Sequence, residues 1–206
     1  MIRVLIADDQ ALIRSALAAL LSLEPDIEVV GQAGTCAEAI TVAGETRPDV
    51  VLLDVQMPVE LPGLDDGIDA IRPLLRVAPA ARVVVVTTFG RPGYLRRALE
   101  AGALGFMVKD APADRLLEGV RRAASGLRIV DPELAAASLS MGPSPLTDKE
   151  TAVLAAASGG SSTAAIAASV HLSEGTVRNY LSSAIGKLGA RNRAEALRTA
   201  TDNGWL

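Results

Sequence analysis

The chain has 206 residues, 50% of them hydrophobic, and a formal net charge of −4 at pH 7. This is enough apolar sequence for one large or two small domains, and the acidic balance argues against a protein that coats nucleic acid along its whole surface. One cysteine, Cys36, excludes an intrachain disulfide and is typical of a reducing compartment, and no apolar run approaches the roughly 20 residues of a membrane span, so we expect a cytoplasmic protein with no membrane partner.

The charge is uneven along the chain. Residues 1–141 carry 14 Lys/Arg and 19 Asp/Glu, a net of −5, whereas residues 142–206 carry 6 and 5, a net of +1. The last part of the chain therefore differs in composition from the rest. Because a net of +1 supports DNA binding only weakly, the placement of the charges has to decide that question.

Short apolar strands and amphipathic helices alternate through the first part of the chain. The run from Val50 to Leu53 is apolar throughout, which favours a strand buried on both faces. Alternation of this kind predicts an α/β, flavodoxin-like (βα)5 domain, in which helices cover both faces of a parallel sheet. We predict strands at residues 2–7, 28–33, 50–53, 82–87 and 105–108, and helices at residues 11–23, 37–46, 67–77, 93–101 and 114–125.

Polar side chains lie at the ends of four of these strands. They are Asp8 and Asp9, Asp54, Thr87, and Lys109. Because the carboxyl ends of parallel strands share one edge of a sheet, we expect these side chains to lie together. Two carboxylates about 4 Å apart repel by about 4 kcal/mol at an effective dielectric constant of about 20, so the acids need a cation or a proton. Oxygen ligands of this kind suit Mg²⁺.

The hydroxyl and the ammonium indicate what else this edge could bind. Lys109 and a metal ion could face the oxygens of a phosphoryl group, with the Thr87 hydroxyl as a hydrogen-bond donor. Asp54 would then be the nucleophile that forms an aspartyl phosphate. Taken singly, each residue could equally be a polar strand end that faces water. Together, the acids, the hydroxyl and the ammonium favour a phosphoryl site.

Residues 2 to 126 resemble the receiver domain of bacterial two-component response regulators. The resemblance rests on Asp8-Asp9, Asp54 with Met57-Pro58, Thr87 and Lys109. It implies that a sensor histidine kinase phosphorylates Asp54. It also implies that Asp9, Asp54 and the Gln56 carbonyl bind Mg²⁺, with Asp8 assisting through water.

The same resemblance implies a switch pair, Thr87 and Phe106, in which the hydroxyl moves toward the phosphoryl group and the aromatic ring follows. Thr88 competes for the hydroxyl role, but Thr87 matches the family position. Phe106 could also be simple core filler. Lys109 is followed by Asp110 where the wider family commonly has proline, and Lys-Asp is frequent in one subgroup of the family.

The loop from Pro58 to Gly67 departs from the family pattern because it is longer than usual. Glu60, Asp65 and Asp66 add negative charge to it. We therefore expect this loop to gate access of the kinase or to alter the affinity for the metal.

The last part of the chain has no strand signal. Residues 127–145 are predicted to be a linker, because a short helical piece is followed there by Gly142-Pro143-Ser144-Pro145. The linker separates a domain at residues 1–126 from a small all-α four-helix domain at residues 146–206. Helices are predicted at residues 147–157, 162–170, 173–187 and 193–203.

The third of these helices has one apolar and one polar face. The buried stripe is formed by Val177, Leu181, Ile185 and Leu188, and the opposite face by Gly175, Arg178, Asn179, Ser182 and Gly186. With the preceding helix it predicts a helix-turn-helix, whose second helix reads the major groove. Arg can pair with guanine and Asn with adenine, while the Thr176 and Lys187 side chains could hold phosphates. An ordinary solvated helix face would show a similar pattern.

The sequence of this segment resembles the LuxR/NarL/FixJ type of helix-turn-helix and, within that class, the DesR-like group. The match runs through Leu172-Ser173-Glu174-Gly175-Thr176-Val177-Arg178-Asn179-Tyr180 and Lys187-Leu188-Gly189. The resemblance implies a response regulator, not an enzyme. It implies that phosphorylation of Asp54 leads to a homodimer that binds double-stranded promoter DNA.

Two alternatives remain open. A Mg²⁺-dependent phosphotransfer enzyme could use the same sheet, but it would want a second acid shortly after Asp54, where Val55 and Gln56 stand, and a substrate pocket. A regulator that works without phosphate is the other, and the complete acidic set disfavours it.

Overall fold

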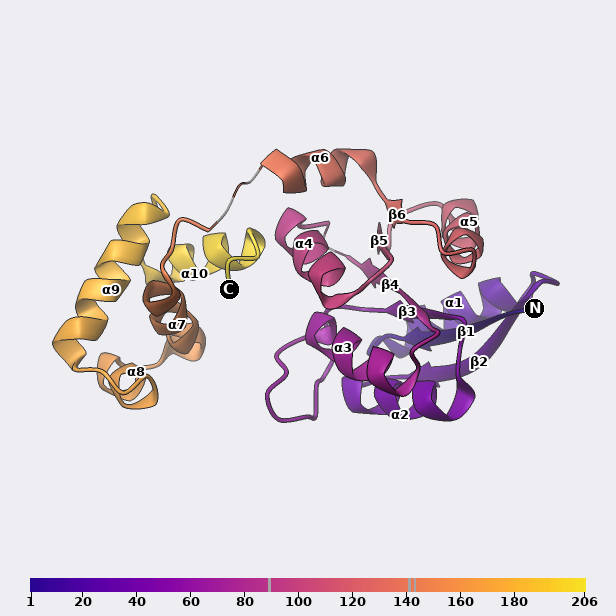
Figure 1. Cartoon of the computed structure of the whole chain (residues 1–206), viewed down its shortest axis with the longest axis horizontal. Coiled ribbons are helices and arrows are strands. Elements are labelled where there is room, and N and C mark those ends of the chain that lie inside the picture. The colour runs from indigo at the N-terminus through magenta and orange to yellow at the C-terminus, as the bar shows by residue number, and fades with distance from the viewer. Residues whose placement is uncertain (89, 141, 143) are drawn as a thin grey trace. The chain divides into compact units, whose positions relative to one another are not determined.

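The computed structural model describes residues 1–88, 90–140, 142 and 144–206 (Figure 1). The chain divides into two compact units, one of residues 1–90 and 95–135 and one of residues 91–94 and 136–206. Among the described residues no helix is long and apolar enough to cross a membrane.

The first unit is built on a six-stranded parallel sheet with the strand order β2-β1-β3-β4-β5-β6. The predicted α/β, flavodoxin-like fold is confirmed, and so are the five predicted strand–helix pairs. The strands are β1 (Ile2–Ala7), β2 (Ile27–Ala33), β3 (Val50–Leu53), β4 (Arg82–Thr87), β5 (Gly105–Val108) and β6 (Ile129–Val130). The helices are α1 (Ala11–Ser22), α2 (Cys36–Thr46), α3 (Gly67–Val77), α4 (Pro92–Ala101) and α5 (Ala113–Ala124).

β6 is not among the strands predicted from the sequence, because residues 129 and 130 were assigned to the linker. The strand is only two residues long and pairs with β5 at Gly105 and Phe106. A two-residue strand has no periodicity to detect, so only its pairing reveals it. The sheet therefore extends beyond the predicted boundary at residue 126.

The core packs around the strands whose ends carry the predicted acids. β3 is buried along its whole length, as its uninterrupted apolar run predicts. α1 and α5 cover one face of the sheet and pack on side chains from β1, β3 and β4, while α2 and α3 lie on the other side (Figure 1). Central strands buried on both faces give rigid strand ends, and those ends carry the polar residues.

The second unit is helical, as predicted. α6 (Pro132–Ser140) begins in the first unit and ends in the second, and it corresponds to the short helical piece of the predicted linker. Met141 and Pro143 of that linker lie outside the described residues. The remaining helices are α7 (Asp148–Ala156), α8 (Thr163–Ser169), α9 (Glu174–Lys187) and α10 (Arg193–Asp202), with a short 3-10 turn at Ser158–Gly160.

Side chains mark where these helices begin. Thr147, Ser162, Ser173 and Asn192 each accept a backbone N–H from the first turn of α7, α8, α9 and α10. Such caps satisfy amides that have no partner within the helix. They explain how four short helices with few aromatic residues hold fixed ends.

Candidate functional site

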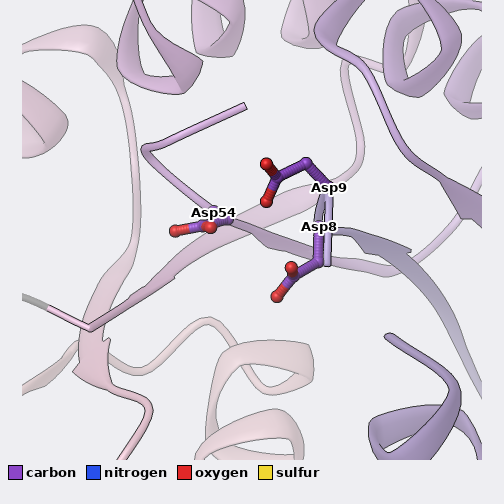
Figure 2. A group of neighbouring side chains, drawn as sticks. All are labelled: Asp8, Asp9 and Asp54. Atoms are coloured by element: carbon purple, nitrogen blue, oxygen red, sulfur yellow. The ribbon is translucent and has the colours of Figure 1, made fainter. Parts of the chain in front are cut away.

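Three carboxylates gather at the ends of β1 and β3. Asp8, Asp9 and Asp54 each offer an oxygen atom within 4.8 Å of the others (Figure 2). The Asp54 N–H donates to the Ala7 carbonyl at 2.9 Å, so the pairing of the two strands continues into the acidic residues. Asp8 and Asp54 are both 2% exposed, whereas Asp9 is exposed. The predicted convergence of these acids at one edge is therefore present in the structure.

Lys109 follows β5 and reaches this cluster. Its Nζ lies 2.8 Å from Asp54 Oδ2 and 2.7 Å from Asp8 Oδ2, and its side chain is only 7% exposed. Burial by itself lowers the pKa of the Lys109 ammonium, but the hydrogen bonds to Asp54 and Asp8 outweigh burial and raise that pKa above its usual value. The ammonium therefore stays charged at neutral pH.

The pKa of Asp54, the phosphoacceptor candidate, is set by opposing effects. Burial raises the pKa of the Asp54 carboxyl; the Lys109 ammonium lowers it, the Asp8 charge raises it, and the net shift is upward. The Val55 N–H also donates to Asp54 Oδ1 at 2.8 Å. One oxygen of Asp54 is thus fixed by the backbone and the other by Lys109.

The donor set fits a divalent metal ion. Three carboxyl groups and one ammonium carry a formal charge of −2, and two of the acids are buried, where unbalanced charge is costly. Oxygen ligands are those that Mg²⁺ prefers. Glu60, Asp65 and Asp66 of the long loop are not part of this group of potential ligands.

The remaining predicted residues of this edge differ in exposure. Thr87 ends β4 and is fully buried, while Thr88 is exposed. Phe106 on β5 is also fully buried and pairs in register with Val85 of β4. The Gln56 side chain is exposed. The Thr87 carbonyl accepts the Lys109 N–H at 2.8 Å, so the hydroxyl-bearing residue and the ammonium-bearing residue are held side by side.

In the second unit, α9 has the two faces that its sequence predicts. Val177 and Ala184 are buried, while Arg178, Asn179 and Ser182 are exposed. Ser173 caps the helix, and its hydroxyl lies 2.8 Å from the Thr176 hydroxyl. The exposed face is short and polar and carries one guanidinium group, which is ion-paired with Glu174 at 3.4 Å. Exposed pairs of this kind are weak, so Arg178 can exchange this partner for another.

The Lys187 ammonium, which the sequence predicts to contact phosphate, is already paired within the domain. Its Nζ lies 2.6 Å from Glu150 Oε2, and the Ser183 hydroxyl donates to Glu150 Oε1 at 2.6 Å. Glu150 is 4% exposed and also accepts the Thr147 N–H at 2.7 Å. Glu150 therefore links α7 to α9, a role that the sequence reading missed although Thr147-x-x-Glu150 has the spacing of a capping box.

Comparison with known proteins identifies both units. Residues 4–121 match the response regulator receiver domain family, and residues 144–200 match the bacterial regulatory proteins of the luxR family. The chain is 38% identical to the transcriptional regulatory protein DesR of Bacillus subtilis over 206 residues, and 40% identical to the uncharacterized transcriptional regulatory protein YvfU of the same organism over 206 residues, covering 100% of both chains in each case.

Solved structures agree with this assignment. The response regulator ChrA of a heme-sensing two-component system is 33% identical, with a TM-score of 0.56 and coverage of 100% of this chain and 98% of that chain. RcsB dimers bound to DNA share the fold, with a TM-score of 0.69 at 24% identity and 98% coverage of both chains. The chain belongs to the two-component response regulators and is a transcriptional regulator with a receiver domain followed by a LuxR-type DNA-binding domain.

Proposed function

We propose that Asp54 is the phosphoacceptor of this regulator and that a sensor histidine kinase supplies the phosphoryl group. The observation that carries the proposal is the buried Asp54 carboxylate, which contacts Lys109 inside a group of three acids. An Asp54 oxygen attacks phosphorus while the bond from phosphorus to the kinase histidine breaks, so the imidazole leaves and an acyl phosphate forms. The Lys109 ammonium balances negative charge on the phosphoryl oxygens.

Asp8, Asp9, Asp54 and the Gln56 carbonyl would hold Mg²⁺ at this edge. Bound there, the ion supplies charge neutralisation for the phosphoryl oxygens. With the Lys109 ammonium counted, the formal charge of this group of acids is −2, which supports a divalent rather than a monovalent ion. Of these residues, Asp8, which is buried beside Lys109, would assist through water rather than bind the ion directly.

The Thr87 hydroxyl and the Phe106 ring would transmit the event. Both residues are fully buried and lie on neighbouring strands, so neither can move without a change in packing. A hydroxyl drawn toward the phosphoryl group would leave space that the ring can fill. The receiver surface then changes, and two copies form a homodimer that places two DNA-binding domains on paired half-sites.

The DNA-binding surface would be the exposed face of α9. Arg178, Asn179 and Ser182 would read base edges, and Thr176 and Lys187 would contact phosphates. Lys187 could do so only by sharing or leaving its contact with Glu150. A regulator of this kind has to meet both the kinase and double-stranded promoter DNA in one compartment, so we propose that it acts in the cytoplasm. The proposed domains are residues 1–126, to whose sheet β6 (Ile129–Val130) is added, and residues 146–206, with the rest of residues 127–145 joining them.

Phosphorylation with acetyl phosphate tests the receiver part of the proposal. The full chain with Mg²⁺ should gain one phosphoryl group, measured by intact mass, that is labile in acid and base. Asp54→Asn should gain none, and chelation of the metal should stop the reaction in the unchanged chain. Phosphate-dependent DNA binding that persists in Asp54→Ala would contradict the proposed switch. Turnover of a small phosphate ester would instead favour a phosphotransfer enzyme.

Genome-wide footprinting with and without acetyl phosphate would give the operator and test the DNA-binding part. On that operator, Arg178→Ala should relax sequence preference, with a loss of about 1–3 kcal/mol against the best site. Ala substitution of exposed Lys149 on α7 is the matched control and should leave sequence preference unchanged. Equal losses on specific and unrelated DNA for Arg178→Ala would show that it contacts only phosphates.

A further inference from the structure

Arg97 of α4 forms a partly buried ion-pair cluster with the start of α3. Its guanidinium lies 2.8 Å from Asp66 Oδ2 and 3.2 Å from Asp69 Oδ1, with a second contact of 3.3 Å to Asp66 Oδ1. The side chains of Arg97 and Asp66 are 21% and 20% exposed. A fork-shaped guanidinium that grips one carboxylate with two nitrogens fixes its geometry more strictly than a single contact would.

Asp66 is also the cap of α3. Its Oδ1 accepts the Ile68 N–H at 2.9 Å and the Asp69 N–H at 3.3 Å. Burial raises the pKa of the Asp66 carboxyl, Arg97 opposes this shift, and the net direction is upward. The ionised cap therefore depends on Arg97, because the same burial without a cation would favour the protonated acid or its movement into water.

The first turn of α3 rests directly on the backbone of the phosphoacceptor. The Gly67 N–H donates to the Val55 carbonyl at 2.8 Å. A Cβ on Gly67 would lie 2.0 Å from the Asp54 carbonyl oxygen and 3.1 Å from the Val55 carbonyl oxygen, so only glycine allows this approach. A shift of the α3 start would therefore be felt at the peptide that carries Asp54.

The long loop that precedes α3 gives this start little support of its own. Residues 60–63 are exposed, and Glu60 and Gly63 have positive φ angles. The Pro58 carbonyl accepts the Cys36 N–H at 2.9 Å and anchors the beginning of the loop. At the end of the loop, Asp66 supplies the anchor through Arg97. The Asp65 N–H also donates to Asp69 Oδ2 at 3.0 Å, and the rest of α3 is held by buried side chains such as Ile71 and Leu74. The part of α3 that depends on the ion pair is therefore its first turn.

We propose that Arg97 is a positioning residue for phosphoryl transfer to Asp54. It acts through the Asp66 cap and the contact of Gly67 with the Asp54 peptide, and it touches neither the phosphoryl group nor the metal. The proposal rests on the proposed phosphorylation of Asp54. Misplacement of a reacting group by about 1 Å can cost on the order of 100-fold in rate, and a partial release of the α3 start should cost about tenfold.

The test measures the rate of Asp54 phosphorylation by acetyl phosphate in the full chain, over a range of acetyl phosphate and Mg²⁺ concentrations. Arg97→Gln should lower the limiting rate about tenfold at saturating concentrations of both. Arg97→Lys should recover part of this loss, because it keeps the charge but not the fork. Arg122→Gln removes an exposed ion pair with Glu118 on α5 and is the matched control, which should keep its rate within about twofold.

Asp66 variants keep the test informative if Arg97→Gln folds poorly. Asp66→Asn retains a capping oxygen but loses the ion pair, and should lower the limiting rate as Arg97→Gln does. The double variant should be no slower than either single variant if the two residues act through each other. A fall in thermal stability with an unchanged limiting rate would overturn the proposal and leave Arg97 with a purely structural role.

The outcomes separate this inference from the proposed function. If the unchanged chain takes no phosphoryl group, or if Asp54→Asn takes one, the proposed function fails. If Asp54 is phosphorylated and Arg97→Gln and Asp66→Asn both match the control, only the positioning role fails.

Discussion

Asp8, Asp54 and Lys109 set the balance of charge at the sheet edge that carries the proposed phosphoacceptor. Two buried carboxylates share one ammonium, and each distance is below 3 Å. The single ammonium cannot fully compensate both acids, which is why the pKa of Asp54 is raised by burial despite its contact with Lys109. A folded-state pKa above the usual 3.8 means that the ionised carboxylate opposes folding at neutral pH. Burial of this carboxylate therefore costs stability at the edge where we propose that phosphate and metal bind.

Asp54→Asn should stabilise the metal-free protein at pH 7, by about 1–2 kcal/mol, because the amide removes a buried charge while Lys109 keeps Asp8 as a partner. The gain should shrink as the pH falls toward 3.8, because Asp54 of the unchanged protein then becomes protonated in both the folded and the unfolded state. Urea unfolding in the presence of a chelator at several pH values measures the difference. A destabilised variant at pH 7 would show that the Lys109 contact outweighs burial.

At this residue scale, local sequence predicts some contacts and cannot predict others. The acids, Thr87 and Lys109 were predictable because parallel strands end at one edge. The pairs Arg97–Asp66 and Lys187–Glu150 were not, because their partners lie 31 and 37 residues apart on helices whose facing sides no pattern reveals. Exposure of Arg178 and burial of Val177 followed from helical periodicity alone.

At the scale of elements, one carboxylate joins the first and third helices of the DNA-binding domain. Glu150 on α7 receives hydrogen bonds from Thr147, Ser183 and Lys187. The Lys187 ammonium, followed by the Ser183 hydroxyl and the Thr147 N–H, lowers the pKa of Glu150 from 4.5 to about 2. Because the folded-state pKa is depressed, the stabilisation is present above pH 4.5 and is lost as the pH falls toward 2.

Glu150→Gln should destabilise this domain by about 2 kcal/mol at pH 7 and remove part of its loss of stability between pH 4.5 and about 2. The single tryptophan, Trp205, packs in the hydrophobic cluster of this domain, so its fluorescence follows unfolding there. Glu174→Gln, which alters an exposed carboxylate on α9, is the control and should change stability little. If Glu150→Gln loses stability in acid just as the unchanged protein does, the hydrogen bonds to Glu150 are not what stabilises this domain above pH 4.5.

The elements themselves were largely predictable. Periodicity located the five strand–helix pairs and the four helices of the last domain, and the structure changes their ends only slightly. β6 escaped because two residues carry no period. The Ser158–Gly160 turn escaped because its shape depends on Gly159 at φ 75°, a conformation that composition does not specify.

For the whole molecule, charge placement decides how DNA binding can be regulated. The chain carries −4 overall, and the DNA-binding part has few basic residues to offer. Lys187 is held by Glu150, and Arg191 by Glu195 at 3.0 Å. One domain alone can therefore neutralise few phosphates and should bind weakly. Two domains joined by dimerisation double that number without any new contact within either domain, which is how phosphorylation of Asp54 could control occupancy of an operator.

The salt dependence of binding tests this view of the whole molecule. Each neutralised phosphate contributes about −0.9 to the slope of the logarithm of the association constant against the logarithm of salt concentration. The phosphorylated chain on paired half-sites should therefore show about twice the slope of the unphosphorylated chain on a single half-site, measured by fluorescence anisotropy. Equal slopes for the two would mean that phosphorylation improves the fit of one domain rather than recruiting a second. In that case Asp54 would control the DNA-binding domain within a single chain, and dimerisation would be unnecessary for operator binding.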